Sequence, residues 1–332
     1  MVPPAVRRLQ RLAGLGSRAL AGAALAVDLT VGWSAGAGRA VLLAGLLASI
    51  PHGAVDHLVP RSLPGWRGPR PVLLALAYAA VAVAAFLVFR AAPGPALLVF
   101  LLLSVAHFGA GETAFADRAA ARPRRRDPLT AAAFGAAVVL LPLAHHRADL
   151  APLVAEVSGG NPGLPPGPAA AVEVTTLALL AVAAVRRWRR GAASEAADLA
   201  LLTALVLVVP PTVAVGVYVG GWHAPRHLAR MLSTEPANRT DLAAGRLGEP
   251  LWRFGRQAAL PTLAVLLALV LFWPNARWPE SAAVTVMVIA ALTVPHALVV
   301  GALDRAARLA SPAAGSSDRS RRSVPNDVGT PL

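Results

Sequence analysis

The sequence contains no cysteine, and all 31 of its basic residues are arginine. Without thiols the chain cannot form disulfide bonds, hold an iron–sulfur cluster or offer thiolate ligands. Any bound metal must therefore be held by nitrogen or oxygen atoms. Without lysine the chain has neither a phosphate-binding loop lysine nor a Ser-x-x-Lys motif, so nucleotide-driven and serine–lysine chemistry have no support.

Charged and aromatic residues are also scarce, at 14% and 5% of the chain, whereas apolar residues make up 56%. Long Ala/Leu/Val runs recur along the chain, which is typical of membrane proteins. A chain of 332 residues can hold roughly ten spans of about 20 residues each. We therefore expect an all-α, polytopic integral membrane bundle of about 8–10 transmembrane helices. The expected spans lie near residues 19–36 (the weakest), 40–58, 71–90, 95–116, 128–146, 169–186, 196–209, 212–231, 258–273 and 281–303.

The arginines gather in alternate loops between these spans. If the N-terminus is cytoplasmic, only four arginines face outside, and the remainder lie inside, as the positive-inside rule requires. We therefore expect a multi-pass protein of the cell (plasma or inner) membrane with both termini cytoplasmic, whose inner loops contact anionic lipids. The formal charge is +14, but no basic face with interleaved aromatic residues is present, so a nucleic-acid partner is not expected.

The chain divides into three parts by composition. We expect a basic, amphipathic cytoplasmic lead over residues 1–18, a single transmembrane domain over 19–305, and a disordered cytoplasmic tail, rich in Ser, Arg and Pro, over 306–332. Within the domain, Pro210-Pro211 should end one helix and begin the next, because proline has no N–H to donate.

Six of the eight histidines lie in the apolar segments, which is costly unless they serve a function. They form four clusters around His52, His107, His223 and His296. The four spans that carry them run in the same direction in the expected topology, and each histidine precedes the next inner arginine by seven to eleven residues. This spacing places all four imidazoles roughly 10 to 17 Å above the inner boundary. We therefore predict one intramembrane metal site.

Helical spacing relates some of these residues to one another. His223 and His227 are four residues apart, which puts two imidazoles on one helical face. Asp56 follows His52 by the same interval, so we expect its carboxylate to accept the second N–H of that ring. Glu112 follows His107 by five residues and points about 140° away, toward another neighbour.

The residues in and near these clusters also have interpretations that involve no metal. A lone intramembrane histidine often donates an interhelical hydrogen bond, and the glycines near the clusters could serve close helix packing or make room for a ligand. His57 could line the pocket or meet the lipid headgroups. His145 and His146, beside Arg147, are expected at the membrane interface. Pro225, between His223 and His227, could aim the two rings at one ion or spoil their alignment.

Four motifs together resemble one known family. They are His52-Gly-Ala-Val-Asp56, His107-Phe-Gly-x-x-Glu112, Trp222-His223-x-x-Arg226-His227 and Pro295-His296. In this order and spacing they resemble the membrane-embedded β-carotene 15,15′-dioxygenase (Brp/Blh-like) family of bacteria and archaea, over roughly residues 40 to 305. Two positions depart from the family pattern, because Glu112 stands where Asp is common and Pro225 interrupts the third motif.

The resemblance implies a multi-helical membrane enzyme with non-haem Fe(II) held by His52, His107, His223 and His227. Surrounding or pocket residues would be Asp56, His57, Glu112, Trp222, Arg226 and His296. Such an enzyme would cleave the central double bond of β-carotene with O2 and give two molecules of retinal, in functional association with a microbial rhodopsin. A substrate dissolved among membrane lipids would enter laterally between helices.

Other classes of protein remain open at this stage. A histidine-lined transporter or proton pathway could use intramembrane His, Asp and Glu. Another iron-dependent lipid oxidase, hydroxylase or desaturase would also act on lipids, although the richer His-x-x-His-His boxes of the di-iron enzymes are missing. A non-catalytic carotenoid-binding protein would need no metal.

Overall fold

The computed structural model describes residues 2–56, 70–122, 127–272 and 280–309, and these residues form helices and no strand. The expected all-α fold is thereby confirmed. In chain order the helices are α1 (Pro4–Thr30), α2 (Ala35–Gly53), α3 (Arg70–Ala91), α4 (Pro93–Ala119), α5 (Pro128–His145), α6 (Arg147–Ser158), α7 (Pro166–Arg189), α8 (Ala193–Val208), α9 (Pro211–Gly216), the π-helix η2 (Val217–His223), α10 (Ala224–Thr234), the 3₁₀ turn η3 (Pro236–Asn238), α11 (Arg239–Ala243), α12 (Gly248–Phe272) and α13 (Glu280–Leu309).

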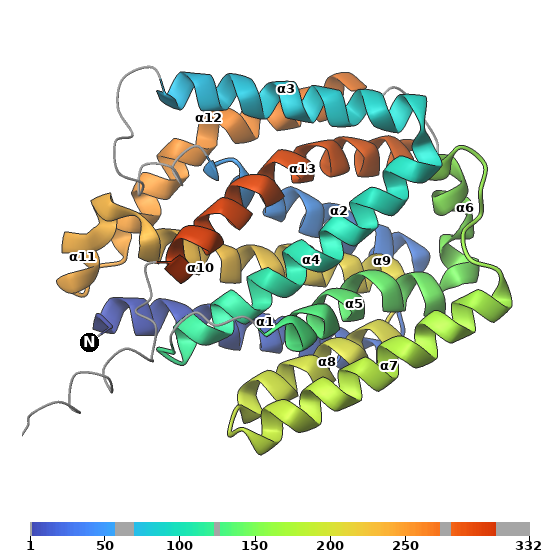
Figure 1. The fold of residues 1–332 in the computed structure, drawn as a ribbon, viewed down its shortest axis with the longest axis horizontal. Helices are drawn as coiled ribbons and strands as arrows, with labels where there is room; N and C mark the ends of the chain where they lie inside the picture. The colour runs from blue at the N-terminus through green and yellow to red at the C-terminus, as the bar shows by residue number, and fades with distance from the viewer. Residues whose placement is uncertain (1, 57–69, 123–126, 273–279, 310–332) are drawn as a thin grey trace, which may run out of the picture.

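Eight of the described helices are long and apolar enough to cross a membrane, namely α1 to α5, α7, α12 and α13. Two further helical stretches, α8 and the continuous segment α9–η2–α10, belong to the same bundle (Figure 1). The chain is thus a multi-pass membrane protein. The loop over 209–210 separates α8 from α9, as the Pro210-Pro211 pair predicts.

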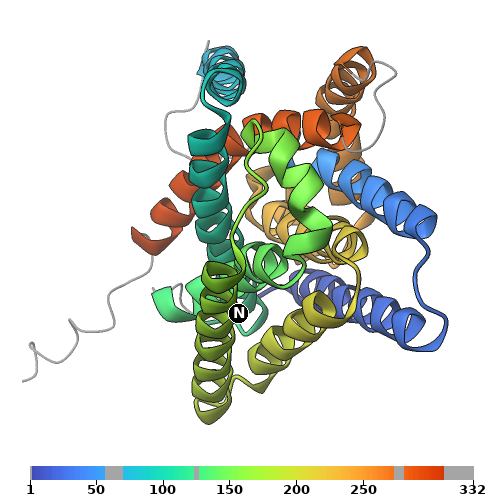
Figure 2. The ribbon, with the colours of Figure 1, turned by 90° about the vertical axis from the view of Figure 1, so that its right-hand side faces the viewer.

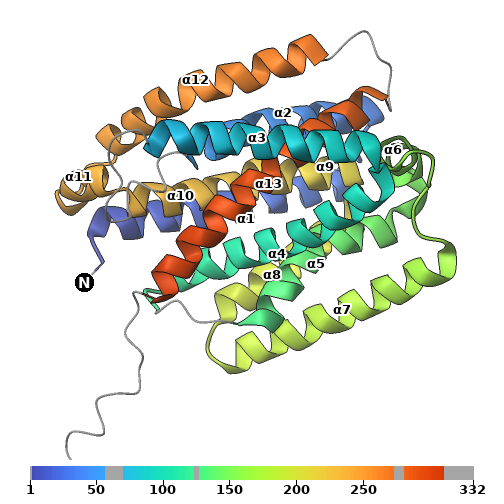
Figure 3. The same cartoon turned by 45° about the horizontal axis from the view of Figure 1, so that its top comes forward.

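The long helices lie side by side, and the chain runs back and forth along them (Figures 1 and 3). The four segments that carry the histidine clusters, α2, α4, η2–α10 and α13, all run in the same direction. Seen along the bundle, the gold η2–α10 segment occupies the middle (Figure 2). This arrangement confirms the parallel direction that the sequence predicts for those four segments.

The first helix differs from expectation. α1 begins at Pro4 and ends at Thr30, so the described part of the stretch 1–18 is not separate from the helix expected over 19–36. Its buried residues recur every three or four positions, from Val6 through Gln10, Gly14 and Ser17, which places one face of a continuous helix against the bundle. The tail is expected from residue 306, but α13 continues to Leu309, so residues 306–309 are helical, and residues 310–332 lie outside the described ranges.

Glycines let the site helices approach closely. A Cβ atom built on Gly45 of α2 would lie 2.1 Å from the carbonyl oxygen of Gly216, and one on Gly220 would lie 2.5 Å from the Cα of Gly45. A Cβ on Gly109 of α4 would lie 1.9 Å from the Ala131 oxygen of α5. Such contacts are impossible for a larger residue, so these glycines set the spacing of helices that carry histidines.

Ion pairs join three helix ends at one end of the bundle. Asp127, which caps α5, lies 3.0 Å from Arg186 and 3.2 Å from Arg187 of α7, and Arg187 also pairs with Glu195 of α8. Burial would raise the pKa of the Asp127 carboxyl, but hydrogen bonds from Thr130 and the nearby guanidinium charges outweigh it and hold the pKa below its ordinary value.

Candidate metal centre

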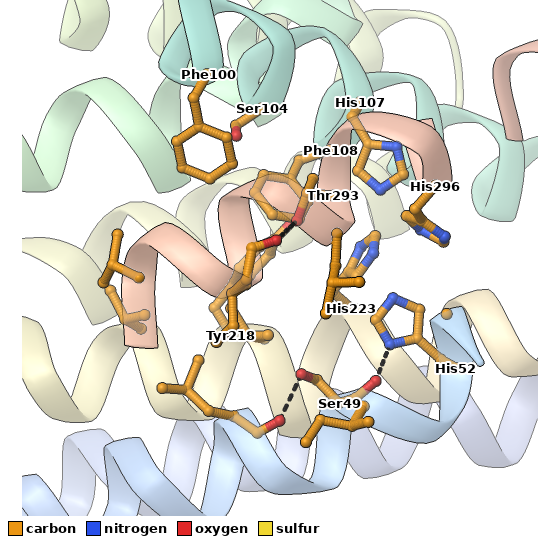
Figure 4. A pocket seen from close by; sticks show the side chains of 18 of the residues that line it. Ser49, His52, Phe100, Ser104, His107, Phe108, Tyr218, His223, Thr293 and His296 are labelled. Carbon is orange, nitrogen blue, oxygen red and sulfur yellow. Dashed lines mark hydrogen bonds between the residues drawn. The ribbon is translucent and has the colours of Figure 1, made fainter. Parts of the chain in front are cut away.

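Five imidazole rings meet inside the bundle, from His52, His107, His223, His227 and His296. The His52 ring centroid lies 5.3 Å from those of His223 and His227 and 5.1 Å from that of His296. The His107 centroid lies 5.4 Å from that of His223 and 4.8 Å from that of His296. The structure therefore brings together the four predicted ligands, and it adds His296 to them. Figure 4 shows the rings of His52, His107, His223 and His296.

His223 and His227 keep a common orientation despite Pro225. Their ring centroids are 5.9 Å apart and the rings are inclined by only 25°. His223 ends the π-helix η2, in which the turn is widened, and Pro225 stands in the first turn of α10. The helical segment is continuous across this junction, because the Ala224 N–H donates to the Val219 carbonyl oxygen, and the proline removes only the N–H that residue 225 would otherwise donate. The proline thus leaves the pair aligned.

Several ring nitrogen atoms in the cluster have no hydrogen-bonding partner in the described part of the chain. They are Nε2 of His223, Nε2 of His296 and both ring nitrogens of His227, all of them buried. Leaving such atoms unpaired is costly in a protein interior, whereas a metal ion would satisfy them. Suitable nitrogen or oxygen atoms of His52, His223 and His296 lie within 4.8 Å of one another. The donor set therefore fits a transition-metal ion.

His52 is fixed by its own helix. Its Nδ1 donates a hydrogen bond to the Ser49 carbonyl oxygen one turn earlier, and Nε2 is left on the side of the cluster (Figure 4). The expected contact with Asp56 is wrong. α2 ends at Gly53, and the chain then turns, so the helical spacing between His52 and Asp56 does not apply. Asp56 instead accepts a hydrogen bond of 2.7 Å from Nδ1 of His296 and one of 3.1 Å from the Tyr78 hydroxyl.

Glu112 serves another neighbour, as its position on α4 predicts. Its Oε2 accepts a hydrogen bond of 3.1 Å from the Trp222 indole and one of 2.9 Å from Arg226. The Arg226 guanidinium lies over the Trp222 ring, 3.9 Å from its centroid. These three residues form a buried polar group beside the histidines and tie α10 to α4.

A cavity of about 630 Å³ adjoins the cluster and contacts His52, His107, His223 and His296. Apart from these rings its wall is mainly apolar, with Phe100 and Phe108 of α4, Tyr218 of η2 and aliphatic residues of seven further helices. On α13 the lining residues run from Val286 to His296 and do not continue past the histidine. The histidines thus close one end of the cavity on that helix, and the apolar space extends from them (Figure 4).

Comparisons with known proteins indicate the family of this chain. A family model described as beta-carotene 15,15′-dioxygenase matches residues 43–304. This chain belongs to the β-carotene 15,15′-dioxygenase family. The probable beta-carotene 15,15′-dioxygenase Blh of Halobacterium salinarum is 34% identical over 323 residues, which cover 88% of this chain and 91% of that protein. No solved structure matches the chain.

The matched range of this β-carotene 15,15′-dioxygenase family member, residues 43–304, is close to the range of 40 to 305 expected from its motifs. All five clustered histidines lie inside the matched range. His57 lies outside the described residues. His145 and His146 are not part of the cluster, because His145 pairs with Glu173 at 2.8 Å and His146 contacts the Val206 carbonyl oxygen at 2.8 Å.

Sequence reasoning missed several polar residues of this family member. Asp198 of α8 accepts hydrogen bonds of 3.0 Å from Arg226 and 2.6 Å from Arg18 of α1. Arg230 of α10 donates one of 2.6 Å to Asp304 of α13 and so joins two histidine-bearing helices. The available signal was an acidic residue within an otherwise apolar helix, which is a functional hypothesis by default even without a neighbouring histidine.

Proposed function

We propose that this protein uses non-haem Fe(II) and O2 to cleave the central 15,15′ double bond of β-carotene and release two molecules of retinal. The observation that carries the proposal is a group of buried, neighbouring imidazoles at the end of an apolar cavity, in a chain of the β-carotene 15,15′-dioxygenase family. Neither feature alone would suffice, because buried histidines also occur in transporters and apolar cavities also bind lipids without reaction.

The chemistry of the donors supports iron. Imidazole nitrogens bind Fe(II) well, and the chain has no thiolate that would favour softer metals. We assign His52, His107, His223 and His227 as ligands. Bound Fe(II) would supply the activation of O2. Because imidazoles are neutral ligands, such a centre avoids the cost of burying unpaired carboxylates in the membrane.

The neighbouring residues orient the ligands. Ser49 holds the His52 ring through its carbonyl oxygen, which leaves only one nitrogen of that ring for a metal. Arg226, bonded to Glu112 and Asp198, fixes the helical turn between His223 and His227. The apolar wall of Phe100, Phe108 and the aliphatic side chains would exclude water from the reacting double bond.

The cavity suits an apolar substrate that arrives from the bilayer. Leu74 of α3 and Pro261 of α12 line it, whereas the neighbouring Leu76 and Leu260 on the same helices are exposed, at 62% and 76%. The wall between cavity and lipid is thus one helix thick at these two places. We propose that β-carotene enters laterally there and places its centre at the histidines, with one half of the polyene in the cavity.

The position of the arginines and the proposed product, retinal, together indicate a cellular setting. Arg186, Arg187 and Arg122 lie at one end of the bundle, so we propose that this end is cytoplasmic in the cell membrane, together with both termini, where it contacts anionic lipid headgroups. Retinal is the chromophore that a microbial rhodopsin requires, so we also propose a functional link to such a protein.

The test combines activity with metal analysis. The protein is produced in carotene-accumulating cells, retinal is extracted, and iron is measured in the detergent-purified protein. We expect retinal and about one iron per chain, and we expect both to be lost in His107→Ala. The matched control is His145→Ala, because His145 bonds to Glu173 away from the cluster. Purified protein without iron, in cells that form no retinal, would favour a transporter or proton pathway and overturn the proposal.

A further inference from the structure

His296 lies among the other four imidazoles rather than behind them. Its ring centroid is 4.8 Å from that of His107, 5.1 Å from that of His52 and 5.2 Å from that of His227. His296 is also the residue shared by two groups of side chains whose possible ligand atoms lie within 4.8 Å of one another, one with His52 and His223 and the other with Asp56 and His227. A residue that only lined the substrate pocket would not need this central position.

The two nitrogens of His296 have different surroundings. Nδ1 donates a hydrogen bond of 2.7 Å to Oδ2 of Asp56, whereas Nε2 is buried and has no hydrogen-bonding partner in the described ranges. A carboxylate on one nitrogen fixes the tautomer, because it requires a proton there, and it makes the other nitrogen a more basic acceptor. This is the arrangement found at metal-binding histidines, whose second N–H commonly bonds to a carboxylate.

Asp56 is itself held in place. The Tyr78 hydroxyl of α3 lies 3.1 Å from the Oδ2 atom of Asp56 and 3.2 Å from the Leu292 carbonyl oxygen, which lies one turn before His296 on α13. Asp56 is only 2% exposed, and among the described residues His296 is the only partner of its carboxylate that can carry a positive charge. A buried carboxylate needs positive charge nearby, and an imidazole bound to a divalent cation supplies part of it.

We propose that His296 is a direct ligand of the metal, so that the centre contains five imidazoles, and that Asp56 and Tyr78 are the residues that position it. This inference rests on the proposed function, because it concerns the same iron. It changes the ligand set implied by the sequence motifs, in which His296 belongs to the surrounding pocket.

Metal binding tests this inference independently of retinal formation. Fe(II) and Co(II) are titrated into detergent-purified apoprotein of the full chain, and the visible spectrum of the Co(II) form is recorded, because its band positions and intensities depend on the number of ligands. We expect His296→Ala to weaken Co(II) affinity at least tenfold and to shift the spectrum. The matched control is His146→Ala, whose ring contacts the Val206 carbonyl oxygen outside the cluster, and it should leave both unchanged.

A rescue experiment separates a ligand from a structural residue. In His296→Gly, added free imidazole should restore the Co(II) spectrum and most of the affinity, since it can occupy the vacated position. Asp56→Asn should weaken affinity by roughly 10- to 100-fold, as is typical when the partner of a ligating histidine is changed. Tyr78→Phe, which removes one hydroxyl and little volume, should have a smaller effect of the same sign.

The possible results separate the role of His296 as a ligand from the proposed function of the protein. If His296→Ala binds Co(II) as tightly as the unmodified protein and with the same spectrum, while His107→Ala loses it, the inference is overturned and the four-histidine centre stands. A shifted spectrum that free imidazole does not restore also overturns it. If none of these variants changes metal binding, the proposed metalloenzyme function fails as well.

Discussion

Arg226 of α10 and Glu112 of α4 form an ion pair of 2.9 Å between side chains that are 3% and 2% exposed. Arg226 lies between His223 and His227 in sequence, so the same ion pair that joins the two helices also fixes the helical turn that carries two of the rings. The second carboxylate on Arg226, that of Asp198 at 3.0 Å, extends the contact to α8. The arrangement of the histidine cluster and the packing of the bundle thus depend on one guanidinium.

Removing one member of this group should destabilise the protein strongly. We expect Arg226→Ala to lower the free energy of unfolding by about 3–5 kcal/mol, because it leaves buried carboxylates without their charge partner. Thermal unfolding in detergent measures the effect. The matched control is Arg246→Ala, whose ion pair with Asp241 is 2.7 Å long but whose side chain is 57% exposed; it should cost no more than about 1 kcal/mol. Equal effects in the two variants would contradict the structural role of Arg226.

The close approach of α2 to the α9–η2 segment should not tolerate a methyl group. Gly45→Ala would place its Cβ 2.1 Å from a backbone oxygen, so the helices must separate. We expect a loss of about 1–3 kcal/mol or more and a lower retinal yield, since α2 carries His52. In Gly22→Ala the added methyl meets no atom within 4 Å, so it should be neutral or stabilising by about 0.5–1 kcal/mol. If Gly45→Ala and Gly22→Ala lowered the melting temperature equally, the close packing at Gly45 would be contradicted.

The cavity can be filled without changing the histidines. Ser104 of α4 lines the cavity, and its hydroxyl has no hydrogen-bonding partner in the part of the chain that the structure describes. We expect Ser104→Phe to reduce retinal formation at least tenfold while iron content stays the same, because the ring occupies space needed by the polyene. Leu102→Phe, on the exposed side of the same helix at 59% exposure, should leave both properties unchanged. Full activity in Ser104→Phe would place the substrate elsewhere.

Topology can be tested with single cysteines, since the chain has none of its own. Ala120 follows the C-terminal end of α4, and Asn161 lies between α6 and α7, at opposite ends of the bundle (Figure 1). We expect a membrane-impermeant thiol reagent to label Asn161→Cys on intact cells and Ala120→Cys only after permeabilisation. The reverse pattern would invert the proposed orientation, although it would leave the parallel direction of the histidine-bearing helices intact.

Much of the site was predictable because its signals are local. Apolar runs and arginine-rich loops indicate the spans, and the distance from each histidine to the next inner arginine indicates a common depth. The four-residue spacing of His223 and His227 predicts that their rings share a face, and their ring planes are inclined by only 25°. These properties depend on residues within one helix, and one helix has a known geometry.

The remaining contacts were decided by tertiary packing. The sequence interval between His52 and Asp56 has the length of a helical turn, but α2 ends at Gly53 and the carboxylate reaches His296, which is 240 residues away in the chain. The carboxylates of Asp198 and Asp304 likewise bond to arginines on other helices. Sequence alone determined that this protein is a membrane bundle with imidazoles in one layer. The rotation of each helix about its axis decided which side chains meet there, and that rotation is set by close packing between distant segments, such as Gly45 against Gly216.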